Sequence, residues 1–122
     1  MGSNPINLAL RFVLEIIMFV AMALWGWRQG DGFLRFVFAL GVPLIAAILW
    51  GTFAVPGDPS RSGKSPVRTP GIIRLLLELA LFGFGTWAIY DMGYVTVSMV
   101  YGALVLIHYG LSYDRILWLV KQ

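Results

Sequence analysis

Two pairs of opposite charges stand at helical spacing inside apolar segments of the chain. Glu15 follows Arg11 by four residues, and Glu78 follows Arg74 by the same interval. Residues four apart lie on one face of an α-helix, so each pair can form an ion pair within its own helix. Charged side chains inside a membrane-spanning helix are costly, and they mark ion paths, proton relays or helix contacts. These four residues are therefore the first candidates for a functional site.

A later apolar segment carries a polar face that can meet these pairs. Its members recur at helical spacing and are Tyr94, Ser98, Tyr101, Val105, His108 and Ser112. Asn7 extends the face of Arg11 by one helical turn toward the N-terminus. The sequence thus predicts an intramembrane polar cluster made of Arg11, Glu15, Arg74, Glu78, His108, Asn7, Ser98 and Tyr101.

Two interpretations of this cluster stay open. In the functional one, the cluster binds a proton, an ion or a charged head group, because paired intramembrane carboxylates are typical of proton-coupled carriers. In the structural one, Arg11 pairs with Glu78 and Arg74 pairs with Glu15 across a pseudo-twofold axis, which locks two helices together. With one histidine and no cysteine, the chain offers no set of ligands for a closed metal site, and we predict neither a metal nor a cofactor.

The composition indicates the environment in which these charges lie. Of the 122 residues, 59% are hydrophobic and 12% are charged, against about a quarter charged in an ordinary soluble domain. A membrane-spanning helix needs about 20 mostly apolar residues, so the chain has room for four such helices and little else. The net charge of +3 comes from scattered basic residues. We interpret these as signals of membrane orientation and expect no nucleic-acid partner.

The elements that must position the charges follow from the apolar segments. We predict helices at residues 6–27, 33–54, 71–90 and 94–113, within a single membrane domain that covers residues 1–122. Short connections join the first two helices and the last two, which makes each pair an antiparallel hairpin. Residues 55–70 are polar and rich in proline, and we expect a linker there. The tail at residues 115–122 is too short to span, so it either lies at the membrane surface or prolongs the fourth helix. The predicted fold is an all-α, four-transmembrane-helix bundle of two helical hairpins.

The charges outside these helices predict the orientation of the chain in the membrane. Most of them fall in the linker and the tail, namely Arg61, Lys64, Arg68, Arg115 and Lys121. Positive loops stay in the cytoplasm, so we expect both termini and the linker on the cytoplasmic side of the bacterial inner membrane.

The two hairpins resemble each other in their first helices. Residues Arg11, Leu14, Glu15 and Phe19 recur 63 positions later as Arg74, Leu77, Glu78 and Phe82. Since one helix intervenes, both segments cross the membrane in the same direction, and the repeat is parallel.

The chain resembles the YrdB-like family of small bacterial integral membrane proteins. The resemblance is carried by the segments at residues 7–15, 25–27, 41–44, 50–51 and 74–78, and it weakens through the fourth helix. It implies a four-helix membrane protein and no catalytic residue.

These features predict a small non-enzymatic multi-pass membrane protein whose immediate partner is the lipid bilayer. It is either a carrier of small or amphiphilic molecules or an accessory or structural subunit. The cargo and any association between copies of the chain are left open. A membrane enzyme that acts on lipid through Glu15, Glu78 or His108 is less favoured, because no nucleophile or metal motif accompanies these residues.

Overall fold

The computed structural model describes residues 5–55 and 67–122, and it is almost entirely helical. The helices are α1 (Pro5–Trp27), α2 (Phe33–Thr52), α3 (Gly71–Asp91), α4 (Val95–Leu111) and α5 (Tyr113–Val120). Two short strands, β1 (Phe53–Ala54) and β2 (Val67–Arg68), pair in parallel. Helices α1, α2 and α3 are each long and apolar enough to cross a membrane, and α4 with α5 adds a fourth crossing if the bent pair forms one span.

Helices α1, α3 and α4 each bury one stripe of side chains. In α1 the buried positions include Asn7, Arg11, Leu14 and Met18, which recur every three or four residues. Helices α3 and α4 show the same periodicity. Helix α2 differs, because Ala46 is its only buried residue and its large apolar side chains are mostly exposed. Such an apolar surface is favourable in contact with lipid and unfavourable in contact with water.

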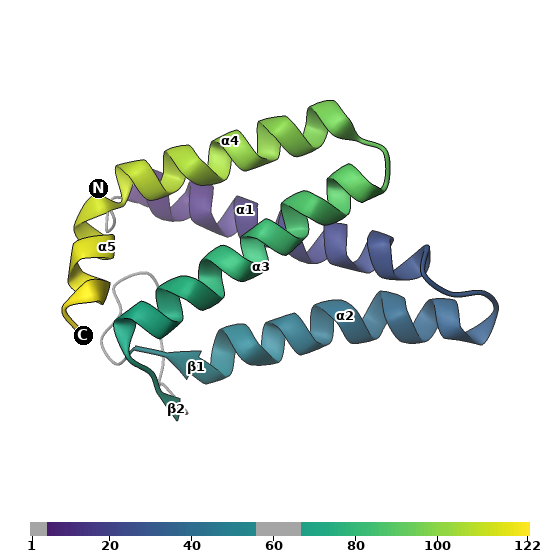
Figure 1. Cartoon of the computed structure of the whole chain (residues 1–122), viewed down its shortest axis with the longest axis horizontal. Helices are drawn as coiled ribbons and strands as arrows, with labels where there is room; N and C mark the ends of the chain where they lie inside the picture. The colour runs from purple at the N-terminus through teal and green to yellow at the C-terminus, as the bar shows by residue number, and fades with distance from the viewer. Residues whose placement is uncertain (1–4, 56–66) are drawn as a thin grey trace.

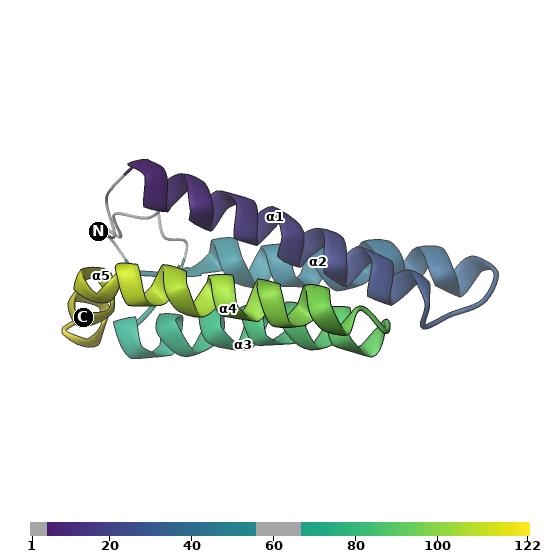
Figure 2. The ribbon, with the colours of Figure 1, turned by 90° about the horizontal axis from the view of Figure 1, so that it is seen from above.

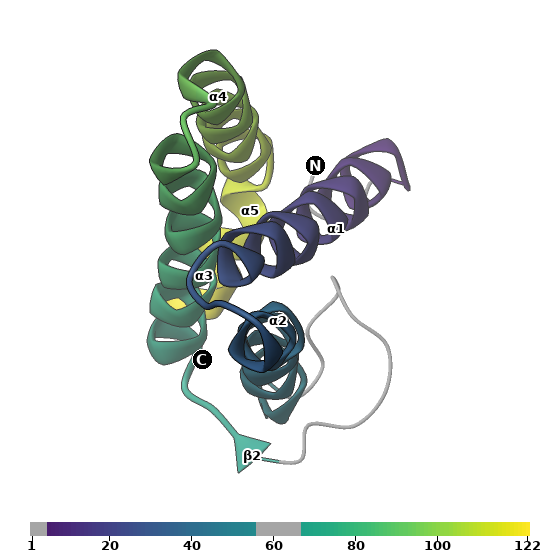
Figure 3. The ribbon, with the colours of Figure 1, turned by 90° about the vertical axis from the view of Figure 1, so that its right-hand side faces the viewer.

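Helix α1 is the centre of the arrangement. It packs against α2, α3 and α4, and it crosses the α3–α4 hairpin obliquely (Figures 1 and 3). The connections between α1 and α2 and between α3 and α4 lie toward one end of the molecule (Figure 1). The start of α1, the start of α3 and the whole of α5 lie at the opposite end (Figure 2).

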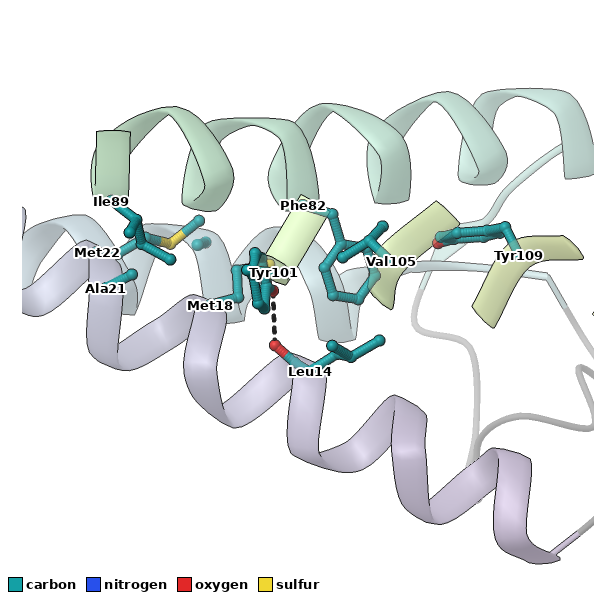
Figure 4. Close-up of a cluster of buried hydrophobic side chains, with 10 residues drawn as sticks. Leu14, Met18, Ala21, Met22, Phe82, Ile89, Tyr101, Val105 and Tyr109 are labelled. Carbon is teal, nitrogen blue, oxygen red and sulfur yellow. Dashed lines mark hydrogen bonds between the residues drawn. The ribbon is translucent and has the colours of Figure 1, made fainter. Parts of the chain in front are cut away.

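An apolar cluster joins α1, α3 and α4 in the middle of the molecule. Met18 of α1, Phe82 of α3 and Val105 of α4 are all buried in it. Figure 4 shows the Tyr101 hydroxyl pointing at α1, where it donates a hydrogen bond of 2.7 Å to the carbonyl oxygen of Leu14. A glycine also allows α1 and α2 to pack closely, because a Cβ added to Gly26 would overlap the Phe38 carbonyl of α2.

The end that holds the short connections is joined by polar contacts between the two hairpins. The Trp25 indole donates a hydrogen bond of 2.9 Å to the Asp91 carboxylate, and Arg28 donates one of 2.8 Å to the Met92 carbonyl. These contacts hold the tip of α1 against the tip of α3.

The last predicted helix differs most from the observed structure. Helix α4 ends at Leu111, and α5 starts at Tyr113 with a bend of 69° between them. Of the two alternatives for the tail, a straight continuation of the fourth helix is therefore wrong, and a position at the membrane surface stays a prediction. The bend coincides with Ser112 followed by Asp114, a pattern that is typical of a helix start.

The predicted linker is also more ordered at its edges than its composition indicates. Val55 and Thr69 are buried beside the paired strands, and the amide of Thr69 donates a hydrogen bond to the Ala54 carbonyl. The linker cations Arg61 and Lys64 lie outside the described residues.

Candidate functional site

Glu78 is the centre of a buried ionic cluster. Its carboxylate lies 3.1 Å from Arg11 Nη2 and 2.7 Å from Arg74 Nε. Arg115 binds it with both guanidinium nitrogens, at 2.8 and 2.7 Å. The Tyr109 hydroxyl donates a further hydrogen bond of 2.8 Å. The side chain of Glu78 is 0% exposed, and both of its carboxylate oxygens have donors, so the buried charge is not left unpaired.

These contacts come from four different helices. Arg74 and Glu78 are one turn apart on α3, whereas Arg11 comes from α1, Tyr109 from α4 and Arg115 from α5. A single carboxylate thus connects segments that are far apart in the sequence. Removing it would leave three guanidinium groups without their shared acceptor.

Arg74 also ties the end of α2 to α3. Its Nη1 donates hydrogen bonds of 2.6 Å to the Trp50 carbonyl and 2.7 Å to the Phe53 carbonyl. Carbonyls at a helix C-terminus lack intrahelical hydrogen-bond partners and carry partial negative charge. A guanidinium group supplies both the missing donors and a positive charge. The Trp50 ring lies under the same guanidinium at 4.6 Å and under that of Arg11 at 5.3 Å.

Glu15 has fewer ion-pair contacts than Glu78 and is more exposed. Its only ion pair among the described residues is with Arg11 Nε at 3.1 Å, and 21% of its side chain is exposed. Of the two predicted cross-pairs, the contact between Arg11 and Glu78 is present. The contact between Arg74 and Glu15 is absent from the described part of the chain, because Arg74 is taken up by Glu78 and the end of α2. The pseudo-twofold pairing is therefore wrong in one half.

His108 belongs to a hydrogen-bonded chain of uncharged partners beside the ions. Its Nδ1 lies 2.9 Å from Asn7 Oδ1, and Asn7 Nδ2 donates a hydrogen bond of 2.7 Å to the Ser112 hydroxyl. Asn7 lies one turn before Arg11, so this chain joins α1 to the end of α4. Among the described residues, His108 Nε2 and Arg11 Nη1 are buried without a hydrogen-bond partner.

Two residues of the predicted polar cluster, Ser98 and Tyr101, form their hydrogen bonds elsewhere and not with the charged side chains. The Ser98 hydroxyl donates to the Val95 carbonyl of its own helix, and Tyr101 donates to the Leu14 carbonyl. Ser98 precedes His108 by ten positions in α4, which is about 15 Å along the helix axis. The polar face of α4 is therefore real, but only its C-terminal part reaches the cluster.

Sequence reasoning missed Arg115 and Tyr109 as ligands of Glu78. The sequence places Arg115 in the tail as a cation that signals orientation, although it continues the spacing of His108 and Ser112. That continuation was the available signal. Tyr109 lies one position off the polar face and gave none.

Two grooves between helices have no residue of the ionic cluster in their lining. One of about 720 Å³ runs between α3 and α4 and is lined mainly by apolar residues such as Phe82, together with Thr86 and Ser98. Another of about 300 Å³ lies between α2 and α3, with Met22 of α1 at its edge. Neither is lined by a charged residue. Over residues 5–55 and 67–122, no group of three or more acidic, histidine or cysteine side chains is placed to hold a metal ion.

Two comparisons with known proteins indicate the same family. The family described as "Protein of unknown function (DUF2568)" matches residues 9–106. The uncharacterized protein YrdB of Bacillus subtilis (strain 168) is 39% identical over 119 residues, which cover 98% of this chain and 97% of that protein. No solved structure matches the chain.

Proposed function

The chain belongs to the DUF2568 family of YrdB-like proteins, and we propose that it is a four-span membrane protein that acts as a non-transporting accessory or structural subunit. In this proposal, the ionic cluster fixes how the helices pack and performs no chemistry.

The environment of Glu78 is the observation that supports this proposal. A carboxylate that binds and releases a proton or cargo needs a path to water and a changeable set of partners. Glu78 instead has 0% exposure and four partners from four helices. Such an arrangement favours a fixed structural connection.

Membrane orientation is part of the proposal. The starts of α1 and α3 and the whole of α5 lie at one end (Figure 1), and Arg68 and Lys121 are exposed in these parts of the chain. With the positive-inside rule, these cations support a cytoplasmic position for both termini, in a protein that we propose to lie in the bacterial inner membrane. An impermeant maleimide should label a Lys121→Cys variant in inverted vesicles and leave it unlabelled in intact cells. The reverse pattern would overturn the orientation.

A carrier is the second candidate, and Glu15 is the residue that supports it. This glutamate keeps 21% of its side chain exposed, and Arg11, its one cationic partner among the described residues, also binds Glu78. A proton-coupled carrier of amphiphilic molecules would use such a loosely held carboxylate.

Reconstituted vesicles distinguish the two candidates. The protein is placed in liposomes that contain a pH-sensitive dye, and tetraphenylphosphonium, a lipophilic cation, is added against a pH gradient. We expect the gradient to decay no faster than in protein-free liposomes. Decay that requires both the cation and the protein, and that Glu15→Gln abolishes in a folded variant, would establish the carrier and reject the structural role.

A further inference from the structure

Helix α5 runs between the end of α4 and the start of α3. It begins directly after Ser112, where α4 ends, and near its far end the Leu119 carbonyl lies against Gly71, the first residue of α3. It meets α4 at 69° and crosses the end of the molecule (Figure 1). With eight residues, or about 12 Å, it is too short to span a membrane. Because α5 connects the ends of two long apolar helices, it lies at the level where these helices leave the membrane.

The side chains of α5 form a buried edge and an apolar exposed edge. Arg115 and Leu119 are its two buried residues, and both contact α3. Tyr113, Leu117 and Val120 are each more than half exposed, and they fall within about 60° of one another around the helix. The apolar edge lies about 150° from the buried one, so the contact with α3 leaves it exposed.

A polar edge adjoins the apolar one. Asp114 and Lys121 are exposed and lie about a quarter of a turn from the centre of the apolar edge. Apolar and charged side chains on separate edges are typical of a helix that lies in the membrane interface. In α3, Ile72 and Ile73 directly follow Gly71 and are about half exposed. The apolar surface of α3 therefore begins at the same end of the molecule as α5.

We propose that α5 lies in the membrane interface, with Tyr113, Leu117 and Val120 inserted at the boundary between phospholipid head groups and acyl chains. Lys121 then faces the head groups and water. Helix α4, whose 17 residues are at the short end of the range that spans a membrane, makes the fourth crossing alone. This inference rests on the membrane placement in the proposed function and holds whether the protein is a subunit or a carrier. Helix α5 stays seated on α3, so Glu78 remains covered.

Fluorescence quenching at single cysteines measures the depth of each edge, because the chain has no native cysteine. Leu117→Cys and Val120→Cys place an NBD fluorophore on the apolar edge, and Lys121→Cys is the matched control on the polar edge. The labelled protein is reconstituted in liposomes with iodide on both sides of the membrane. We expect iodide to quench the fluorophore at positions 117 and 120 at least about fivefold less than at position 121.

Nitroxide-labelled phospholipids then identify what covers the apolar edge. A nitroxide near the head group should quench positions 117 and 120 more strongly than one near the methyl end of the acyl chain, because an interfacial helix inserts only about 5–10 Å. Flotation with the liposomes and circular dichroism verify that each variant is inserted and folded. A failure of the protein to enter the membrane is thereby distinguished from a failure of α5 to reach lipid.

Three results would overturn the proposal. Equal iodide quenching at positions 117 and 121 would show that the apolar edge faces water. Protection from iodide without quenching by either phospholipid would show that a second copy of the chain covers this edge. Stronger quenching by the nitroxide near the methyl end would place α5 deep in the membrane, as part of a broken fourth span.

Discussion

The two arginine–glutamate pairs of this protein begin from the same local pattern and end in different environments. In α1, Glu15 lies four residues after Arg11, keeps one cationic partner and remains partly exposed. In α3, Glu78 lies four residues after Arg74, is fully buried and receives donors from α1, α4 and α5 as well. Spacing within a helix therefore supplies the pair, and neighbouring helices determine what the pair does.

The difference arises from what surrounds each segment. Helix α3 has the end of α2 at Arg74 and α5 across its first turns. In the part of the chain that the structure describes, no short helix packs in the same way over the corresponding part of α1. The similarity of the two segments thus does not extend to their tertiary contacts.

The largest expected effect is that of Glu78→Gln. The amide keeps the shape of the carboxylate but leaves three buried guanidinium groups without a shared charge, and breaking a buried ion pair costs about 3–5 kcal/mol. We expect a loss of that size in the free energy of unfolding, measured by denaturant titration in detergent. A variant that unfolds at the same denaturant concentration as the parent would show that the charge of Glu78 does not stabilise the fold.

A smaller effect is expected from Tyr109→Phe. It removes a hydrogen bond to a charged group, which is worth about 1.5–3 kcal/mol. Tyr101→Phe is the matched control, since it removes a hydrogen bond of similar length to a neutral carbonyl, worth about 1 kcal/mol. Equal losses in the two variants would mean that the charge of Glu78 adds nothing to its contact with Tyr109.

The smallest effect is expected from Glu15→Gln. Arg11 keeps its contact with Glu78 when Glu15 is neutralised, and partly exposed ion pairs contribute about 0–1 kcal/mol. We therefore expect a loss of at most about 1 kcal/mol in the same titration. A loss as large as that of Glu78→Gln would make the two pairs equivalent after all.

Much of this arrangement could be predicted from the sequence. The apolar segments fix the long helices, and the cost of intramembrane charge brings Arg11 and Glu78 together. Asn7 and His108 also meet, as their positions on facing stripes indicate. These features depend on periodicity and charge, which the sequence displays directly.

The remainder depends on contacts that periodicity does not encode. The bend at Ser112 turns Arg115 from a tail residue into a ligand of Glu78. Gly110, Ser112 and Asp114 surround the bend, but these residue types do not give its angle or direction. Gly71 gives no sign in the sequence that a carbonyl of α5 lies against it. The competition for Arg74 between Glu15, Glu78 and the end of α2 is likewise decided only by the three-dimensional packing.

A pair of double-mutant cycles on the two corresponding ion pairs tests most directly how far they differ, because each cycle isolates the coupling between its two side chains. One cycle combines Arg74→Gln with Glu78→Gln, and the other combines Arg11→Gln with Glu15→Gln, all measured as free energies of unfolding in the same detergent. We predict a coupling of at least about 2 kcal/mol for Arg74 with Glu78 and below about 1 kcal/mol for Arg11 with Glu15. Equal couplings, or a larger one for Arg11 with Glu15, would contradict the central role of Glu78.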